Sequence, residues 1–263
     1  MAMKRATTAF LFLIAMTPLA FAASGRQAAP AQSLRSAPPQ YTHFTVAEFE
    51  RGFMALAFGS DLRIGARPRG IRRFDRPILA HIFAGGSVAR ANAMASIVEE
   101  YAGKVPNLHL GITPDRENAD IEIRLIDERD FRAALRAAFG VKVARDFVRR
   151  TNPQCMTSVK SNEGGAIVRS VSFIIVDKGE EVFRDCAYHE LLHAFGLSNH
   201  DQRNRWTTLN QKRTVSYLTV YDRGLLTLLY DPAITPGMTR AAVRAVLPRV
   251  IGSLGLATPA KRH

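Results

Sequence analysis

The sequence of 263 residues is poor in cysteine, tryptophan and acidic side chains. With two cysteines and 18 glycines, it cannot form a disulfide-dense scaffold or a collagen-like fibre. After residue 22, no apolar run approaches the roughly 18–20 residues of a membrane span, so no transmembrane segment is expected after signal removal. An apolar content of 47% with 22% charged residues excludes wholesale disorder and indicates one large globular domain or two small ones.

The first 22 residues have the features of a secretory signal peptide. Lys4 and Arg5 precede the apolar stretch Ala9–Phe21. Ala20 and Ala22 then place small residues at the two positions that a signal peptidase reads. The alternative is an uncleaved anchor helix, but the apolar stretch is short for one. We therefore expect cleavage after Ala22 and an exported protein, either periplasmic or secreted. Loss of the signal lowers the net charge from +13 to +11, so the mature chain stays strongly basic.

After the signal we expect a flexible leader at 23–42, a single domain at 43–250 and a C-terminal tail at 251–263. Helix signatures and β-like runs alternate through the domain, at 45–59, 77–83, 87–103, 119–126, 127–140 and 168–176. Two further helices are expected after Thr219 and Thr239, each of which can cap a helix. This order predicts an α+β (mixed α/β) fold in which helices cover a twisted sheet.

The two cysteines are expected to form a disulfide bond between Cys155 and Cys186, because an exported protein folds in an oxidising compartment. Closing the loop between them would stabilise the fold by about 3–4 kcal/mol in the loop-entropy model. The alternative is thiolate ligation, since Cys186 lies three residues before His189 and the two could bind one metal from a helix. That arrangement would leave Cys155 without a partner.

An arginine-rich stretch lies before the first β-like run. Its members are Arg63, Arg67, Arg69, Arg72, Arg73 and Arg76. Such a stretch could attract an anionic envelope polymer, and the alternative is a solvated basic loop. No aromatic residues are interleaved for base stacking, so no nucleic-acid partner is expected.

The segment with the clearest chemistry is His189-Glu190-Leu-Leu-His193. Residues four apart share one face of a helix, so His189 and His193 can direct two imidazoles at one point, with the Glu190 carboxylate beside it. Two imidazoles that hold zinc, next to a glutamate general base, are the elements of a zinc hydrolase motif. Gly196 can end the helix and turn the chain back, which would bring His200 to the site.

The third protein ligand is open among three neighbouring residues. His200 is favoured, because a neutral imidazole is a strong zinc ligand and would complete a three-histidine site for one Zn²⁺ with an open position. Asp201 is the carboxylate alternative. Asn199 is the third, although its amide is a poor zinc ligand and a good turn residue.

The motif His189-Glu190-x-x-His193-x-x-Gly196 resembles the metzincin clan of zinc endopeptidases, which implies a metzincin-like fold. The clan's third ligand lies three residues after the glycine, where this chain has Asn199, and its methionine turn is absent because no methionine lies between His200 and Met238. The C-terminal part is similar to an uncharacterised family of bacterial exported proteins, a domain of unknown function. That similarity rests on Leu191–Leu197, Leu218–Asp222, Leu225–Pro232 and Pro236–Arg240.

These observations predict an exported zinc metallopeptidase that hydrolyses peptide or protein substrates. A zinc-bound water would attack the carbonyl while Glu190 acts as the general base. The strand expected at 168–176 could offer a backbone edge on which an extended peptide lies. Tyr217 or Tyr221 could stabilise the oxyanion, as a tyrosine does in some metzincins, although a buried or capping role is favoured for each. Two alternatives are a catalytically inactive exported binding protein with this fold and a zinc amidase that acts on cell-wall material.

Overall fold

A computed structural model describes residues 44–59, 69–151 and 153–254 of the chain. The expected signal, the leader and most of the C-terminal tail lie outside these residues. The helices are α1 (Val46–Phe58), α2 (Val88–Lys104), α3 (Glu128–Phe139), α4 (Val141–Thr151), α5 (Glu180–Ala194), α6 (Val220–Leu229) and α7 (Arg240–Ser253). The strands are β1 (Ile78–Phe83), β2 (Leu110–Ile112), β3 (Ile121–Ile126), β4 (Cys155–Ser161) and β5 (Ile167–Ile175). In this part of the chain, no helix combines the length and apolarity that a bilayer crossing demands.

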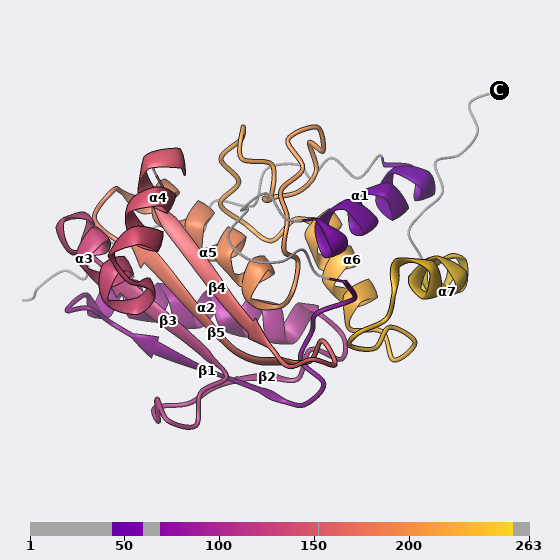
Figure 1. Ribbon diagram of the computed structural model, residues 1–263, viewed down its shortest axis with the longest axis horizontal. Coiled ribbons are helices and arrows are strands. Elements are labelled where there is room, and N and C mark those ends of the chain that lie inside the picture. Colours follow the sequence, from indigo (N-terminus) through magenta and orange to yellow (C-terminus); the bar gives the residue numbers. More distant parts are fainter. Residues whose placement is uncertain (1–43, 60–68, 152, 255–263) are drawn as a thin grey trace, which may run out of the picture. The chain divides into compact units, whose positions relative to one another are not determined.

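The five strands form one sheet in the order β2-β1-β3-β5-β4 (Figure 1). β1 pairs in parallel with both β2 and β3, and β3 pairs in parallel with β5. β4 is the exception, because it runs antiparallel to β5 from Cys155 opposite Ile174 to Ser161 opposite Ile167. This mostly parallel sheet with helices on both faces confirms the expected mixed α/β, α+β class.

The 168–176 run forms a strand, β5, but it does not lie at a sheet edge. β3 pairs with one side of β5 and β4 with the other, so both of its backbone edges are occupied. An expectation that this strand offers a free edge to an extended peptide is therefore wrong. The edge is β4 (Cys155–Ser161), whose half-buried, mostly polar residues gave no clear strand signal.

Side-chain caps fix four of the helix starts that the sequence predicts, whereas Asp127 before α3 makes no capping hydrogen bond through its side chain. Thr45 and Glu48 form a reciprocal capping box at the start of α1, with each side chain bonded to the backbone of the other residue. Ser87, Thr219 and Thr239 accept backbone N–H groups at the starts of α2, α6 and α7. These bonds satisfy donors that a helix N-terminus otherwise leaves without partners.

Helices cover both faces of the sheet (Figure 1), and each face carries its own hydrophobic cluster. Ile174 of β5 points into the larger cluster, the main core, which α1, α2, α5, α6 and α7 share. Its neighbours in β5 point the other way, into a second core beneath α3 and α4. The second core comprises Phe131, Leu135, Ala144, Phe147, Met156, Phe173 and Ile175. The period-two alternation of β5 thus separates α5 from the α3–α4 pair.

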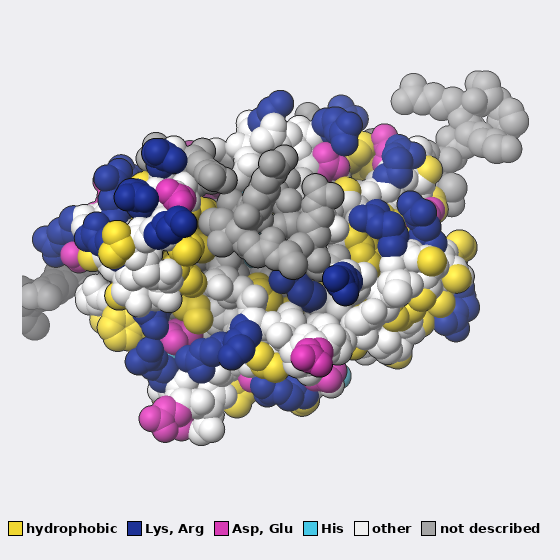
Figure 2. All heavy atoms as spheres, viewed as in Figure 1, with side chains coloured by type: hydrophobic (Ala, Val, Ile, Leu, Met, Phe, Trp, Pro, Cys, Tyr) yellow, Lys and Arg dark blue, Asp and Glu magenta, His cyan; other side chains and the backbone are white. Residues whose placement is uncertain are grey.

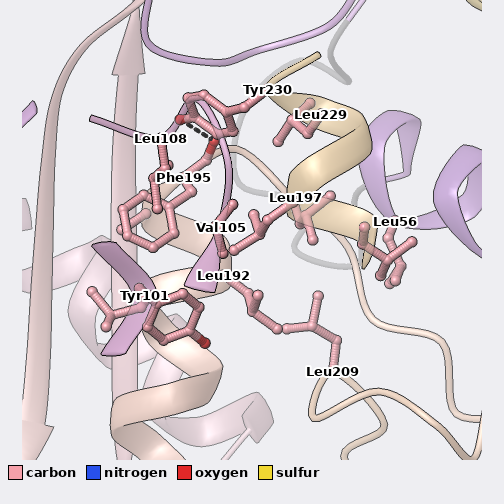
Figure 3. Packing of buried hydrophobic residues seen from close by; sticks show 14 of the residues in the cluster. Leu56, Tyr101, Val105, Leu108, Leu192, Phe195, Leu197, Leu209, Leu229 and Tyr230 are labelled. Carbon is pink, nitrogen blue, oxygen red and sulfur yellow. Dashed lines mark hydrogen bonds between the residues drawn. The ribbon is translucent and has the colours of Figure 1, made fainter. Parts of the chain in front are cut away.

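The main core holds the C-terminal end of α5 in place (Figure 3). Leu192 and Phe195 are fully buried there, and the Tyr230 hydroxyl donates a hydrogen bond of 3.1 Å to the Phe195 carbonyl. Burying side chains of this size stabilises the fold by about 1.5–3 kcal/mol each. The end of α5 is therefore a rigid support for whatever follows it.

The expected disulfide bond between Cys155 and Cys186 is present, with their Cα atoms 5.8 Å apart. It joins the first residue of β4 to α5, which also packs on β4 and β5. At the C-terminus, α7 continues to Ser253 because Val250 and Ile251 are buried in the main core. The last turn of α7 thus includes the first three residues that were expected to belong to the tail.

Candidate metal centre

Three histidine side chains converge at the C-terminal end of α5. The distance between the Nε2 atoms is 3.0 Å from His189 to His200 and 3.1 Å from His193 to each of the other two. We refer to these three side chains as the imidazole cluster. Within the described ranges, it is the one group of histidine, cysteine and acidic residues whose ligand atoms gather closely enough to hold a metal ion.

Backbone carbonyls fix the tautomers of two of these imidazoles. His189 Nδ1 lies 3.0 Å from the Thr208 carbonyl oxygen, and His193 Nδ1 lies 2.6 Å from that of Leu197. A carbonyl only accepts, so each Nδ1 carries the proton and each Nε2 of a neutral ring presents a lone pair. The two Nε2 atoms therefore cannot hydrogen-bond to each other, although they lie 3.1 Å apart. Converging lone pairs of this kind are stabilised by a cation between them.

The turn after α5 brings His200 back to the helix. Leu197 N donates to the Leu192 carbonyl and Gly196 N donates to the His193 carbonyl, which is the Schellman pattern of helix termination. Gly196 has a φ of 120°, and a Cβ there would lie 2.0 Å from the Arg72 carbonyl oxygen. Both the backbone conformation and the close approach require glycine at this position.

The side chains beside His200 face elsewhere. Asn199 Nδ2 donates to the Ala55 carbonyl near the end of α1, at 3.1 Å. Asp201 Oδ1 accepts from the backbone N–H of Arg203 at 3.1 Å, within its own turn. Cys186 is bonded to Cys155, so it offers no thiolate. Of the candidates for the third ligand, the structure brings only His200 into the cluster.

Sequence reasoning missed the residues that support His189 from behind. The Asp222 carboxylate is fully buried and accepts hydrogen bonds from Thr208 N at 2.9 Å, Thr207 Oγ1 at 2.5 Å and Thr219 Oγ1 at 2.9 Å. The same Thr208 presents its carbonyl to His189 Nδ1. Asp222 thus orders the loop that orients a ligand imidazole, a type of second-layer contact that metal sites use widely. In the sequence, Thr219 was expected only as a helix cap, and nothing indicated this role of Asp222.

Burial keeps the imidazole cluster neutral. It lowers the pKa of His189 to about 4 and, with the nearby His189 ring, lowers the pKa of His200 to about 3. The pKa of His193 is also lowered, first by burial and then by the charges of its two neighbours. Neutral imidazoles are the form that coordinates a metal, so the site is ready for a cation at neutral pH.

Glu190 lies next to His189 on α5 and three residues before His193, the spacing at which helix side chains are neighbours. It is 3% exposed, and its Oε2 has no hydrogen-bond partner in the described part of the chain. Burial raises the pKa of Glu190 to about 8. A buried carboxyl group with an oxygen that lacks a partner is costly, and a nearby cation or a bound water would offset that cost.

The two tyrosines that were considered as oxyanion stabilisers belong to the core region. Tyr221 is 1% exposed, and its ring packs against Phe44. Its hydroxyl accepts a hydrogen bond from Asn204 Nδ2 at 2.9 Å and donates one to the Glu48 carbonyl at 3.3 Å. Tyr217 is half-buried and packs against the main core. Neither tyrosine has a ring contact with the imidazole cluster among the described aromatic pairs.

Two members of the arginine-rich stretch are engaged within the fold. Arg63 and Arg67 lie outside the described residues. The Arg73 guanidinium donates to three backbone carbonyls near the end of α6, at 2.7–3.1 Å, and Arg76 pairs with Asp120. Arg73 and Arg76 therefore serve the fold, and the attraction of an anionic polymer by this stretch stays a prediction.

The donor set suits a divalent metal such as zinc. In a tetrahedral site with Zn–N bonds of about 2.0–2.1 Å, ligand nitrogens lie roughly 3.3–3.4 Å apart. The Nε2 atoms of the imidazole cluster are only a few tenths of an ångström closer than that. Three neutral imidazoles thus fit the ion in number, atom type and spacing.

Comparison with protein families gives a match. A family model described as "Protein of unknown function (DUF2927)" matches residues 46–249. No curated protein matches the chain. The matched range agrees with the expected similarity to an uncharacterised family, whereas the resemblance to the metzincins stays a prediction.

Proposed function

Since the chain belongs to the DUF2927 family, whose description assigns no activity, we propose from its own residues that it is an exported zinc-dependent metallopeptidase. The observation that carries the proposal is the convergence of three Nε2 atoms within 3.0–3.1 Å of one another. Two of these atoms must present lone pairs, so the arrangement calls for a cation. His189, His193 and His200 would hold one Zn²⁺ and leave a coordination position for water or substrate.

Zinc bound at this position would supply Lewis acidity and make a water molecule acidic enough to act as a nucleophile near neutral pH. Glu190 would take a proton from the attacking water and return it to the leaving nitrogen of the peptide bond. Its position one residue after His189 and its unpartnered Oε2 support this role. The Thr208 carbonyl and the Leu197 carbonyl would keep the Nδ1 protons in place, so that both Nε2 atoms remain ligands.

Edge strand β4 supports a peptide as the substrate. Its outer backbone edge pairs with no other described strand, and an extended peptide could add to it through main-chain hydrogen bonds. The Thr157 hydroxyl of β4 donates to the Glu190 carbonyl at 3.2 Å, and the disulfide bond ties the start of β4 to α5. A peptide on this edge would therefore lie beside the helix that carries the proposed general base.

Export is supported by the disulfide bond, because such bonds persist in oxidising compartments. A periplasmic or secreted location also agrees with the signal-like features of the first 22 residues.

The test compares Glu190→Gln with Glu181→Gln, an exposed residue on the same helix. Zinc content is measured by elemental analysis, and hydrolysis is measured with a peptide library and mass spectrometry. We expect about one zinc per chain in the wild type and in both variants, with cleavage reduced roughly 10²–10⁴-fold only in Glu190→Gln. Wild-type cleavage by Glu190→Gln would remove the assigned base. Full zinc content in a wild type that cleaves no peptide would favour a non-catalytic protein or an amidase, and release of muropeptides from cell wall would identify the latter.

A further inference from the structure

A second candidate site lies on the α3–α4 pair, on the opposite face of the sheet from α5. A pocket of about 360 Å³ lies between these two helices. Four arginines line it: Arg132 and Arg136 from α3, and Arg145 and Arg149 from α4. In Figure 2, Lys and Arg side chains gather where Figure 1 places α3 and α4.

These arginines have few acidic partners. The segment 128–151 contains seven basic and three acidic residues. Arg145 lies 3.7 Å from Asp146, whereas Arg132, Arg136 and Arg149 form no ion pair with another described residue. All four side chains are exposed. Like charges around one pocket repel, so a bound anion would stabilise this arrangement.

Arginines elsewhere in the chain are used differently. Three of them surround the buried carboxylate of Glu122, at 2.7–3.0 Å: Arg116, Arg124 and Arg169. Together with the hydrogen bonds of Arg73 to backbone carbonyls, these pairs serve the fold. The cluster on α3 and α4 has no such internal carboxylate at its centre.

The rest of the pocket lining is apolar. Val141, Ala144 and Val148 contribute it, and Val141 at the start of α4 is 65% exposed. Apolar side chains make no favourable contact with a free inorganic anion, which would keep its hydration shell where it faces them. It suits a ligand that carries an anionic group and hydrocarbon together, as a phospholipid does.

We propose that the α3–α4 pair docks on a membrane surface and that its four arginines bind the phosphate groups of anionic phospholipids. The guanidinium group matches phosphate in geometry, and Val141 would insert among the first carbons of the acyl chains. Because the second core separates this surface from the main core, docking would leave the imidazole cluster on the other face of the sheet. The proposal does not depend on the metal centre or on any enzymatic activity.

The test measures binding of the purified mature chain to vesicles by co-sedimentation. One vesicle set contains phosphatidylglycerol mixed with phosphatidylcholine, and the other contains phosphatidylcholine alone. The variant Arg132→Gln/Arg136→Gln is compared with Arg244→Gln/Arg249→Gln, which removes the same charge from exposed positions on α7. Each arginine at an anionic surface contributes roughly fivefold to binding, so the α3 variant should bind the anionic vesicles about 30-fold more weakly. The α7 variant should bind like the wild type, and neither variant should lose folded structure by circular dichroism.

A third variant, Val141→Ser, separates lipid from a bare anion. We expect it to weaken vesicle binding while its net charge is unchanged. Equal losses in the α3 and α7 variants would overturn the proposal, because net charge alone would then explain binding. Binding to soluble polyphosphate, but not to anionic vesicles, would also overturn it and would identify a soluble polyanion as the ligand.

Discussion

Removing His200 tests the proposed metal centre most selectively. A structural zinc site with four protein ligands binds its ion with about 10–16 kcal/mol, or about 2.5–4 kcal/mol for each ligand. His200→Ala should therefore weaken zinc binding on the order of 10²–10³-fold. The side chain is half-buried and lies in a loop, so the substitution should leave the fold intact.

The assay is competition for Zn²⁺ with a chelator of known affinity, and circular dichroism checks the fold of each variant. Asn199→Ala is the matched control, because Asn199 bonds to the Ala55 carbonyl of α1 and not to the cluster. It should lower the free energy of unfolding by about 1 kcal/mol, the contribution of a typical hydrogen bond, and leave zinc affinity unchanged. Wild-type zinc affinity in His200→Ala, or a large loss in Asn199→Ala, would refute the assignment of the third ligand.

Three further predictions follow from the surroundings of the cluster. Asp222→Asn should weaken zinc binding about 10–100-fold in the folded protein, because the Thr208 loop would no longer hold the His189 ring in its orientation. A lower melting temperature with unchanged zinc affinity would show that Asp222 has only a structural role. Gly196→Ala should lower the free energy of unfolding, measured by urea denaturation, by about 3 kcal/mol or more, because the new Cβ would clash with the Arg72 carbonyl and the φ would be strained. A loss under about 1 kcal/mol would contradict the turn geometry. Because burial lowers the pKa of His189 to about 4 and that of His200 to about 3, protons compete with zinc only in acid. Zinc affinity, measured against a chelator, should stay nearly constant from pH 7 to about 5 and fall below that, whereas loss already near pH 6.5 would indicate ordinary, exposed imidazoles.

Local signals in the sequence predicted most of the helices. The capping box of Thr45 and Glu48 and the caps at Ser87, Thr219 and Thr239 need only neighbours within three residues, so their chemistry is visible in the sequence. The elements that were missed lack such signals. β2 has three residues, and α4 is a basic helix that buries little beyond Ala144 and Phe147.

Strand order could not be predicted, because it depends on partners far apart in the chain. β5 was expected at an edge, but β4 pairs along its whole length. β4 itself is an edge strand with polar, half-buried residues, and such strands do not show the clear alternation of buried ones.

In the metal centre, too, local spacing could be predicted from the sequence and tertiary contacts could not. The helical spacing of His189 and His193 predicted two converging imidazoles, because that geometry is local. The choice between His200 and Asn199 depends on a hydrogen bond from Asn199 to Ala55, 144 residues earlier, which no local pattern reveals. The support that Asp222 gives to His189 through Thr208 is likewise a tertiary contact.

Zinc K-edge X-ray absorption of the mature protein, loaded with one equivalent of Zn²⁺, tests the central claim most directly. The account predicts three imidazole nitrogens at about 2.0–2.1 Å and a light oxygen scatterer in the remaining position. A first shell that contains sulfur, or one of oxygen atoms without imidazole scattering, would contradict it.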